Sequence, residues 1–304
     1  MHAVDIFLKH TLSGHQNPIF AVENGVVETT FYTGGNDKGV VEWDILSGKF
    51  KRILCAVPAS VYALHRIVGT SLLAIGMRNG EVWLVDTETQ TLEKKFKVDR
   101  GAVFSLQAIA EKQELIAVGE EGVAYIWSLE NGELLYRFRI TDTTIRTLAL
   151  YPDQQQVVFG DKEGRLHLYA VADYQLLTKS AVHTMPVTAL LATDTALYSG
   201  GRDAQLYQLG RQGLHVEQNL TPHMFTVYDI LQYPSSNLLI TVSRDKSIKF
   251  WDKSNLSLLK NVSQEKGFDS HRLSINAACI HSLSRQLITV SDDKLVKVWD
   301  VVVD

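Results

Sequence analysis

The stretch KGVVEWD at residues 38–44 decides the fold, because it returns near the end of the chain as KSIKFWD at residues 246–252 and KLVKVWD at residues 294–300. Four weaker copies lie between them: GEVWLVD at 80–86, GVAYIWS at 122–128, GRLHLYA at 164–170 and AQLYQLG at 204–210. The aligned anchors are Trp43, Val85, Trp127, Tyr169, Leu209, Trp251 and Trp299. Their spacings of 42, 42, 42, 40, 42 and 48 residues indicate seven repeats of one unit.

Each repeat reads as four short strands. Apolar runs such as residues 61–64 and 72–75 are separated by turns rich in Gly, Asn and Asp, and no long helical period competes with them. A single four-stranded unit cannot bury both of its faces, so such units stack radially around an axis. The sequence therefore predicts an all-β fold, a seven-bladed β-propeller with four antiparallel strands per blade, and a single domain over residues 1–304.

The residue pairs that recur at fixed places in the repeats resemble those of the WD-repeat (WD40) β-propeller family. Gly14-His15 with Trp43-Asp44 gives the full Gly-His…Trp-Asp signature, and Trp251-Asp252 and Trp299-Asp300 repeat its second half. The resemblance covers nearly the whole chain. It is specific for the fold and says little about function, because function depends on sites carried by a fold.

The two ends of the sequence predict how the ring closes. The chain stops at residues 301–304, just after the third strand of the seventh repeat, while an apolar segment from Val4 to Leu8 precedes the first Gly-His pair. We expect this segment to complete the last blade, since a closed ring protects strand edges from pairing with other chains. The longer last spacing predicts an extended surface loop around residues 261–270.

Four repeats carry a His, a Ser or Thr, and an Asp at matching positions. A hydrolase triad combines the same residue types. An enzyme needs one such group, however, and here it recurs four times, three times with a Trp six residues after the Asp. The family resemblance implies a structural hydrogen-bond network inside each blade, in which buried polar groups satisfy one another. Its predicted members are His15, Thr33, Asp37, Trp43, His183, Ser199, Asp203, His223, Thr241, Asp245, Trp251, His271, Thr289, Asp293 and Trp299.

The remaining sequence offers no catalytic, cofactor or metal motif. There is no phosphate-binding glycine loop, no HExxH and no EF-hand loop, and two cysteines cannot form a four-cysteine zinc site. We therefore predict no enzyme activity, no cofactor and no metal site. A net charge of −4 argues against nucleic-acid binding. Because no signal peptide and no transmembrane stretch is visible, we expect a cytoplasmic protein without membrane contact that is monomeric by itself.

The family resemblance also suggests where a partner binds. Two positions in each blade are expected to face the same end of the ring: the residue after the β-branched residue that opens the inner strand, and the residue before the turn acid. They combine aromatic and basic side chains, the types that dominate interface hot spots. The candidate partner-binding residues are Phe20, Tyr62, Arg78, Phe104, Arg146, Lys162, Arg202, Tyr228 and Arg244.

These observations favour a non-catalytic protein-interaction scaffold that binds an acidic peptide segment with an apolar anchor at one mouth of the channel. Two alternatives stay open. One is a propeller enzyme of the lactonase or hydrolase type, which would need a metal or carboxylate cluster in the channel. The other is a nucleic-acid-associated subunit of a larger complex, which would use the same Arg and aromatic groups for phosphate contacts and base stacking.

Overall fold

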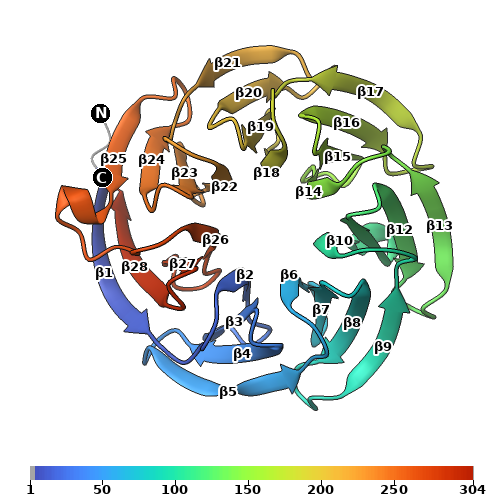
Figure 1. Ribbon diagram of the computed structural model, residues 1–304, viewed down its shortest axis with the longest axis horizontal. Coiled ribbons are helices and arrows are strands. Elements are labelled where there is room, and N and C mark those ends of the chain that lie inside the picture. Colours follow the sequence, from blue (N-terminus) through green and yellow to red (C-terminus); the bar gives the residue numbers. More distant parts are fainter. Residues whose placement is uncertain (1–3, 304) are drawn as a thin grey trace.

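The computed structural model describes residues 4–303 and consists of seven four-stranded antiparallel sheets arranged around a central axis (Figure 1). This architecture confirms the predicted seven-bladed β-propeller. Blade 1 holds β2 (Ile19–Asn24), β3 (Thr30–Gly35), β4 (Gly39–Asp44) and β5 (Lys49–Ala56). Blade 2 holds β6 (Val61–Arg66), β7 (Leu72–Met77), β8 (Glu81–Asp86) and β9 (Leu92–Lys97). Blade 3 holds β10 (Val103–Ile109), β11 (Glu114–Gly119), β12 (Val123–Ser128) and β13 (Leu134–Arg139).

The other four blades continue the same order. Blade 4 holds β14 (Ile145–Leu150), β15 (Gln156–Asp161), β16 (Arg165–Ala170) and β17 (Leu176–Ala181). Blade 5 holds β18 (Val187–Ala192), β19 (Ala196–Gly201), β20 (Leu206–Gly210) and β21 (Val216–Leu220). Blade 6 holds β22 (Val227–Gln232), β23 (Leu238–Ser243), β24 (Ile248–Asp252) and β25 (Leu258–Val262). Blade 7 holds β26 (Ile275–Ile280), β27 (Leu287–Ser291) and β28 (Val296–Val303), with β1 (Val4–Leu12) as its outer strand.

The strand β1 closes the ring as the sequence predicted. It pairs antiparallel with β28, from Val4 opposite Val303 to Leu12 opposite Val296, and runs along the outside of that strand (Figure 1). Ile6 is 4% exposed whereas its neighbour Phe7 is 59% exposed, the alternation that a strand with one buried face requires. Closure therefore joins residues 4–12 to the last blade.

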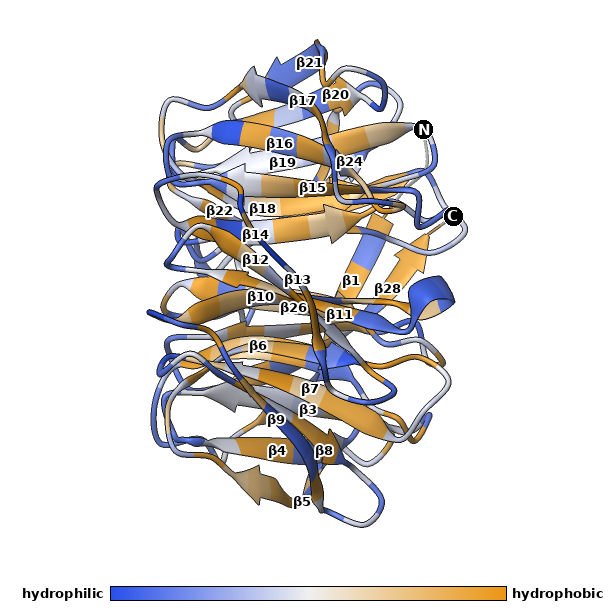
Figure 2. Cartoon of the chain, turned by 90° about the vertical axis from the view of Figure 1, so that its right-hand side faces the viewer, coloured by the Kyte–Doolittle hydropathy of each residue, from blue (hydrophilic) through white to orange (hydrophobic). Residues whose placement is uncertain are grey.

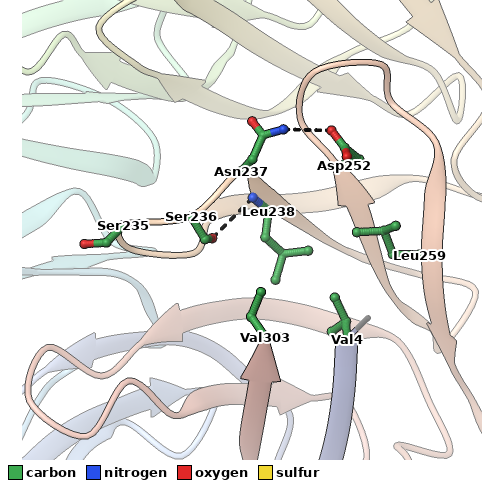
Figure 3. A pocket seen from close by; sticks show the side chains of 8 residues that line it. All are labelled: Val4, Ser235, Ser236, Asn237, Leu238, Asp252, Leu259 and Val303. Carbon is green, nitrogen blue, oxygen red and sulfur yellow. Dashed lines mark hydrogen bonds between the residues drawn. The ribbon is translucent and has the colours of Figure 1, made fainter. Parts of the chain in front are cut away.

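The seam between blades 6 and 7 contains a small hollow of about 260 Å³. Leu238 and Leu259 of blade 6 lie near Val4 and Val303 at the ends of β1 and β28 (Figure 3). The same apolar side chains belong to a buried cluster that spans both blades. Packing across the seam thus supplements the hydrogen bonds of β1.

The core follows from the division of each blade into inner and outer strands. The second strands are wholly or almost wholly buried, whereas most residues of the outer strands are exposed. Figure 2 shows this division, with β7 and β10 mostly hydrophobic and β9 and β21 largely hydrophilic. Buried apolar clusters extend from one blade to the next, so that neighbouring blades share one core.

Short connections complete the fold. The turn between the second and third strand of every blade contains one residue with a left-handed backbone, with φ between 58° and 81°. These residues are Lys38, Gly80, Gly122, Gly164, Ala204, Lys246 and Lys294. One 3-10 turn, η1 (Ala110–Lys112), joins β10 to β11, and a second, η2 (Gln264–Lys266), lies in the long connection between β25 and β26.

Candidate functional site

A backbone hydrogen bond that recurs in all seven blades defines equivalent positions around the ring. In each blade the N–H of the residue before the turn acid, or before Asn79 in blade 2, donates to the carbonyl of the residue that precedes the inner strand, over 2.8–3.1 Å. The donor and acceptor pairs are Asn36 and Pro18, Arg78 and Ser60, Glu120 and Ala102, Lys162 and Thr144, Arg202 and Pro186, Arg244 and Thr226, and Asp292 and Ser274. The four basic residues among the donors therefore start from one backbone position at the same end of the ring.

A β-bulge that also recurs in all seven blades directs a second set of side chains. The register of each inner strand shifts at the residue after its opening Val or Ile, for example between Ile19 and Ala21 and between Val61 and Ala63. Bulges re-aim side chains because the extra residue is left out of the ladder. All seven bulged residues line one cavity of about 570 Å³: Phe20, Tyr62, Phe104, Arg146, Thr188, Tyr228 and Asn276.

One side of this cavity is a continuous row of rings. The ring centres of Phe20 and Tyr62 lie 5.5 Å apart, and those of Tyr62 and Phe104 lie 5.4 Å apart in a stacked arrangement. The guanidinium of Arg146 lies over the Phe104 ring at 4.7 Å from its centre. Blades 1 to 4 thus present an aromatic surface that ends in a cation.

The opposite side of the cavity is polar. Asn276 donates through Nδ2 to the carbonyl of Ile19 and to Asp292, both at 2.8 Å. Asp229 accepts from the backbone N–H groups of Ile230 at 2.9 Å and Ala278 at 3.0 Å, which ties blade 6 to blade 7. Burial raises the pKa of the Asp229 carboxyl to about 6.

Sequence reasoning did not single out Asp229. The available signal was its position, the third residue of the inner strand, where the other six blades have a small residue. Those residues are Ala21, Ala63, Ser105, Thr147, Ala189 and Ala277. Asp229 and Asp292 make the polar side of the cavity less basic than the sequence indicated.

The predicted basic residues are not all in one place. Arg78 and Lys162 share a hollow of about 280 Å³ with Tyr62, Phe104 and Arg146, next to the central cavity. Arg244 instead lines a separate hollow of about 350 Å³ near Phe225. Arg202 is exposed and lines none of these three hollows.

The basic side chains at this end of the ring share one feature. Within residues 4–303, no ion pair is formed by Arg78, Arg146, Lys162, Arg202 or Arg244. On the outer strand β5, by contrast, Lys51 and Arg52 both contact the buried carboxylate of Glu42, at 2.9 and 2.5 Å. The cations at the mouth therefore keep their charge available for another molecule.

The residues of the predicted hydrogen-bond network meet inside four blades. In blade 1, His15 Nδ1 lies 2.7 Å from Asp37 and His15 Nε2 lies 2.7 Å from the Thr33 hydroxyl, to which Trp43 Nε1 donates. Blades 6 and 7 repeat this arrangement with His–Asp distances of 2.9–3.1 Å. In blade 5, which has no Trp at the anchor, His183 contacts Asp203 and Ser199, and the Tyr207 ring packs edge-on against it.

The burial of this network decides what it can do. The hydroxyl-bearing residues Thr33, Ser199, Thr241 and Thr289 are each 0% exposed. Burial lowers the pKa of His15 and of His223, and contacts with His lower the pKa of Asp203 and Asp293 against the opposing effect of burial. Because all four hydroxyls are buried, no substrate can reach them in this structure.

Blades 3 and 4 use other polar pairs at this place. In blade 4, His167 Nε2 lies 2.9 Å from Asp161, and both residues are buried. In blade 3, the Tyr125 hydroxyl donates to Glu121 at 2.7 Å and accepts from the backbone N–H of Asp99. The sequence pattern did not reveal these pairs, because their members lie on different strand positions from the repeated set.

Among the described residues, no three or more His, Cys, Asp or Glu side chains are grouped so that they could hold a metal ion. Over residues 4–303, no helical segment has the length and apolar character that crossing a membrane requires.

Comparisons with known proteins agree with this architecture. Residues 7–44, 215–252 and 262–300 match the family described as WD domain, G-beta repeat. The chain is 28% identical over 196 residues to "Protein ROOT INITIATION DEFECTIVE 3" of Arabidopsis thaliana, covering 58% of this chain and 44% of that protein. It is 24% identical over 142 residues to "WD repeat-containing protein 90" of Xenopus tropicalis, covering 43% of this chain and 8% of that protein.

A third similar protein matches over more of its length. "Target of rapamycin complex subunit LST8" of Mus musculus is 26% identical over 246 residues, which covers 76% of this chain and 74% of that protein. By contrast, the chain spans less than half the length of the two relatives from Arabidopsis and Xenopus.

Proposed function

We propose that this chain, a WD-repeat β-propeller, is a non-catalytic scaffold that binds an acidic peptide segment of a protein partner at the mouth of its channel. The observation that carries the proposal is the set of seven bulged side chains around one cavity, four of them aromatic. Aromatic residues and Arg contribute most to binding energy at protein interfaces. The name of the relative that is a complex subunit supports a role within a protein assembly.

The geometry suggests two different roles for the aromatic and the basic side chains at the mouth. The rings of Phe20, Tyr62 and Phe104 offer an apolar surface against which an anchor side chain of the partner packs. Arg146 lies at the end of this row, and Arg78 and Lys162 line the adjoining hollow. Because these cations make no ion pair within the described residues, a carboxylate of the partner gains a contact without displacing an existing one.

The outlying cations have a different role in this proposal. Arg202 and Arg244 lie on equivalent backbone positions but away from the central cavity. Exposed charges at the rim of an interface mainly raise the association rate. We expect the change of Arg202→Glu together with Arg244→Glu to slow association and reduce its salt dependence.

A capture experiment tests the proposal. The immobilised protein is incubated with lysate of its source, and bound proteins are identified by mass spectrometry. The variant with Arg78→Glu, Arg146→Glu and Lys162→Glu is expected to lose the partner. A matched control, Lys49→Glu with Lys179→Glu and Arg285→Glu, reverses three exposed cations away from the mouth and is expected to retain it. Capture by the mouth variant at the level of the control would exclude this face.

A nucleic-acid partner is the second candidate, and one observation favours it. The row of rings ending in Arg146 also suits the stacking of unpaired bases beside phosphate contacts. The same capture is repeated after nuclease treatment and across salt concentrations. Loss of all bound material with nuclease, together with a steep salt dependence, would replace the peptide with a single-stranded nucleic acid.

A further inference from the structure

A basic hollow between blades 6 and 7 lies apart from the central cavity and shares no lining residue with it. It has a volume of about 350 Å³ and lies between the loop that precedes β22, the turn between β23 and β24, and the long connection that contains η2. Met224 and Phe225 form one edge, and Ser263 and Gln264 lie on the side of the long connection.

The hollow has more positive than negative charge available to a ligand. Of its four Arg and Lys residues, only Lys249 has a hydrogen-bond partner for its side chain within residues 4–303, the carbonyl of Pro222 at 2.7 Å. Within residues 4–303, Arg244, Lys246 and Arg272 form no ion pair. The guanidinium of Arg244 instead lies over the Phe225 ring, 6.0 Å from its centre.

The acids of the hollow do not neutralise these cations. The Asp245 carboxylate already has hydrogen-bond partners in its own blade: it contacts His223 Nδ1 at 2.9 Å and accepts from the backbone N–H of Met224 at 3.1 Å. The second acid, Glu265, is exposed on η2 and makes no ion pair among the described residues. Four cations and only two acids around one hollow leave an excess of positive charge that an anion with two charges would balance.

Phosphate on a side chain has the charge and the acceptors for such a site. It carries close to two negative charges near neutral pH and three oxygens that accept strong hydrogen bonds from Arg and Lys. The edge of the hollow is apolar: Met224 is 80% and Phe225 52% exposed. Clusters of Arg beside a pocket for a neighbouring side chain are one way in which proteins recognise phosphorylated peptides.

We propose that this hollow binds a phosphorylated serine or threonine of a partner peptide, with Arg244, Lys246 and Arg272 around the phosphate. Met224 and Phe225 contact an apolar residue next to the phosphorylated one. The inference rests on the proposed function in one respect, that the ligand is part of a protein. The two sites themselves are separate, since they share no lining residue. The position of the hollow between three loops favours a single side chain over a membrane surface, which would need the cations on a protruding face.

Peptide pools test this site without knowledge of the partner. The probes are a pool of peptides with a fixed phosphoserine and varied neighbours, and the same pool with serine. Retention of both pools on the immobilised protein is measured. We expect retention of the phosphorylated pool, and a weakening of about ten-fold or more in the double variant with Lys246→Glu and Arg272→Glu. The control variant with Lys49→Glu and Lys179→Glu is expected to bind as the parent does.

The outcomes separate this site from the channel mouth. Binding of the phosphorylated pool that survives Arg78→Glu with Arg146→Glu and Lys162→Glu, and is lost in the double variant, would support the hollow even if the proposed function fails. Equal retention of both pools, or retention that the double variant leaves unchanged, would overturn the inference. So would binding to phosphatidylcholine vesicles that contain phosphoinositides when neither peptide pool is retained, since the anion would then be a lipid headgroup.

Discussion

Blades 1, 5, 6 and 7 hold the turn between their second and third strands differently from blades 2, 3 and 4. In the first group an Asp of the turn contacts a buried His, and the left-handed turn residue has a side chain: Lys38, Ala204, Lys246 or Lys294. In the second group the His–hydroxyl–Asp set is absent, and the left-handed residue is glycine: Gly80, Gly122 or Gly164. The backbone angle is nearly the same, with φ between 58° and 81° in both groups.

The difference shows that the hydrogen-bond network of one group and the glycine of the other are two ways of holding the same left-handed turn. A left-handed backbone costs a residue with a Cβ roughly 1–2 kcal/mol, a cost that glycine avoids. Where the Asp is fixed by His and by backbone N–H groups, the turn keeps this conformation despite that cost. Where the network is missing, glycine removes the strain, and it also leaves room for the next connection to pack closely against the turn.

Removing a network hydroxyl is expected to have the largest effect. Thr289→Val deprives both His271 Nε2 and Trp299 Nε1 of their partner, at 2.9 and 3.0 Å. Each buried group left without a hydrogen bond costs about 1–3 kcal/mol, so we expect a loss of about 2–5 kcal/mol. The free energy of unfolding in urea measures it.

Blade 2 supplies the matched control for that substitution. Ile75 occupies the same strand position as Thr289 without a His or Trp to satisfy, so Ile75→Val is expected to cost about 0.5–1.5 kcal/mol. Equal losses of unfolding free energy for the two substitutions would mean that the hydrogen bonds of the Thr289 hydroxyl contribute nothing beyond packing.

The glycine turns are expected to tolerate no side chain. A Cβ on Gly122, which has φ +75°, would lie 2.2 Å from the Thr143 carbonyl oxygen and 2.4 Å from that of Thr141. Gly122→Ala should therefore cost about 2 kcal/mol or more, the backbone strain plus the clash. Gly213 has φ +77° with nothing within 4 Å of the added Cβ, so Gly213→Ala should show the strain alone. Thermal or urea unfolding of the pair would contradict the account if the two losses were the same.

Two buried carboxylates, Asp245 and Glu23, differ in how their protonation changes on folding, and therefore in how stability depends on pH. Contacts with His223 and Ser247 hold the pKa of Asp245 below its ordinary value against the opposing effect of burial. Glu23 on β2 accepts from the backbone N–H groups of Asn24 and Arg66 and lies 3.8 Å from His65 Nδ1, but burial outweighs these contacts and raises its pKa to about 7. The folded protein therefore binds a proton at Glu23 that the unfolded chain releases above pH 4.5, and this contribution to stability is lost as the pH rises through about 7.

Glu23→Gln tests this sign. The amide resembles the protonated acid, so the variant is expected to match the parent in stability at pH 5. At pH 8 it should be more stable by about 1–3 kcal/mol, because the parent then buries a charge. Urea unfolding at both pH values measures the difference. A variant that is less stable than the parent at pH 8 would show that the carboxylate is stabilised where it lies.

The smallest expected effect is at the left-handed residues of the network blades. Lys294→Gly removes the strain at φ +70° but gives the unfolded chain more freedom, so the two effects nearly cancel. We expect a change within about 1 kcal/mol. A larger loss of unfolding free energy would indicate a side-chain contribution of Lys294 that the turn geometry does not require.

These comparisons show what the sequence could and could not predict. The seven repeats and the closing strand were predictable, because the spacing of anchors and the alternation of apolar residues are local signals. For Phe20, Tyr62 and Phe104, the sequence could predict equivalent positions in their blades but not the row that their rings form. The direction of these side chains depends on a bulge that forms when the strands pair. Asp229 and the pair of His167 and Asp161 were not predicted, because their partners come from other blades or from other strand positions.

Side-chain footprinting of the captured complex tests the binding face most directly. Hydroxyl radicals oxidise exposed aromatic side chains, and the chain offers both a candidate set and an internal control. With the partner bound, we predict less oxidation at Tyr62, Phe104 and Tyr228, and unchanged oxidation at Phe50 and Tyr136, which are 53% and 42% exposed on the outer strands. Protection of Phe50 and Tyr136 with no change at the mouth would contradict the account and move the partner to the outer surface of the ring.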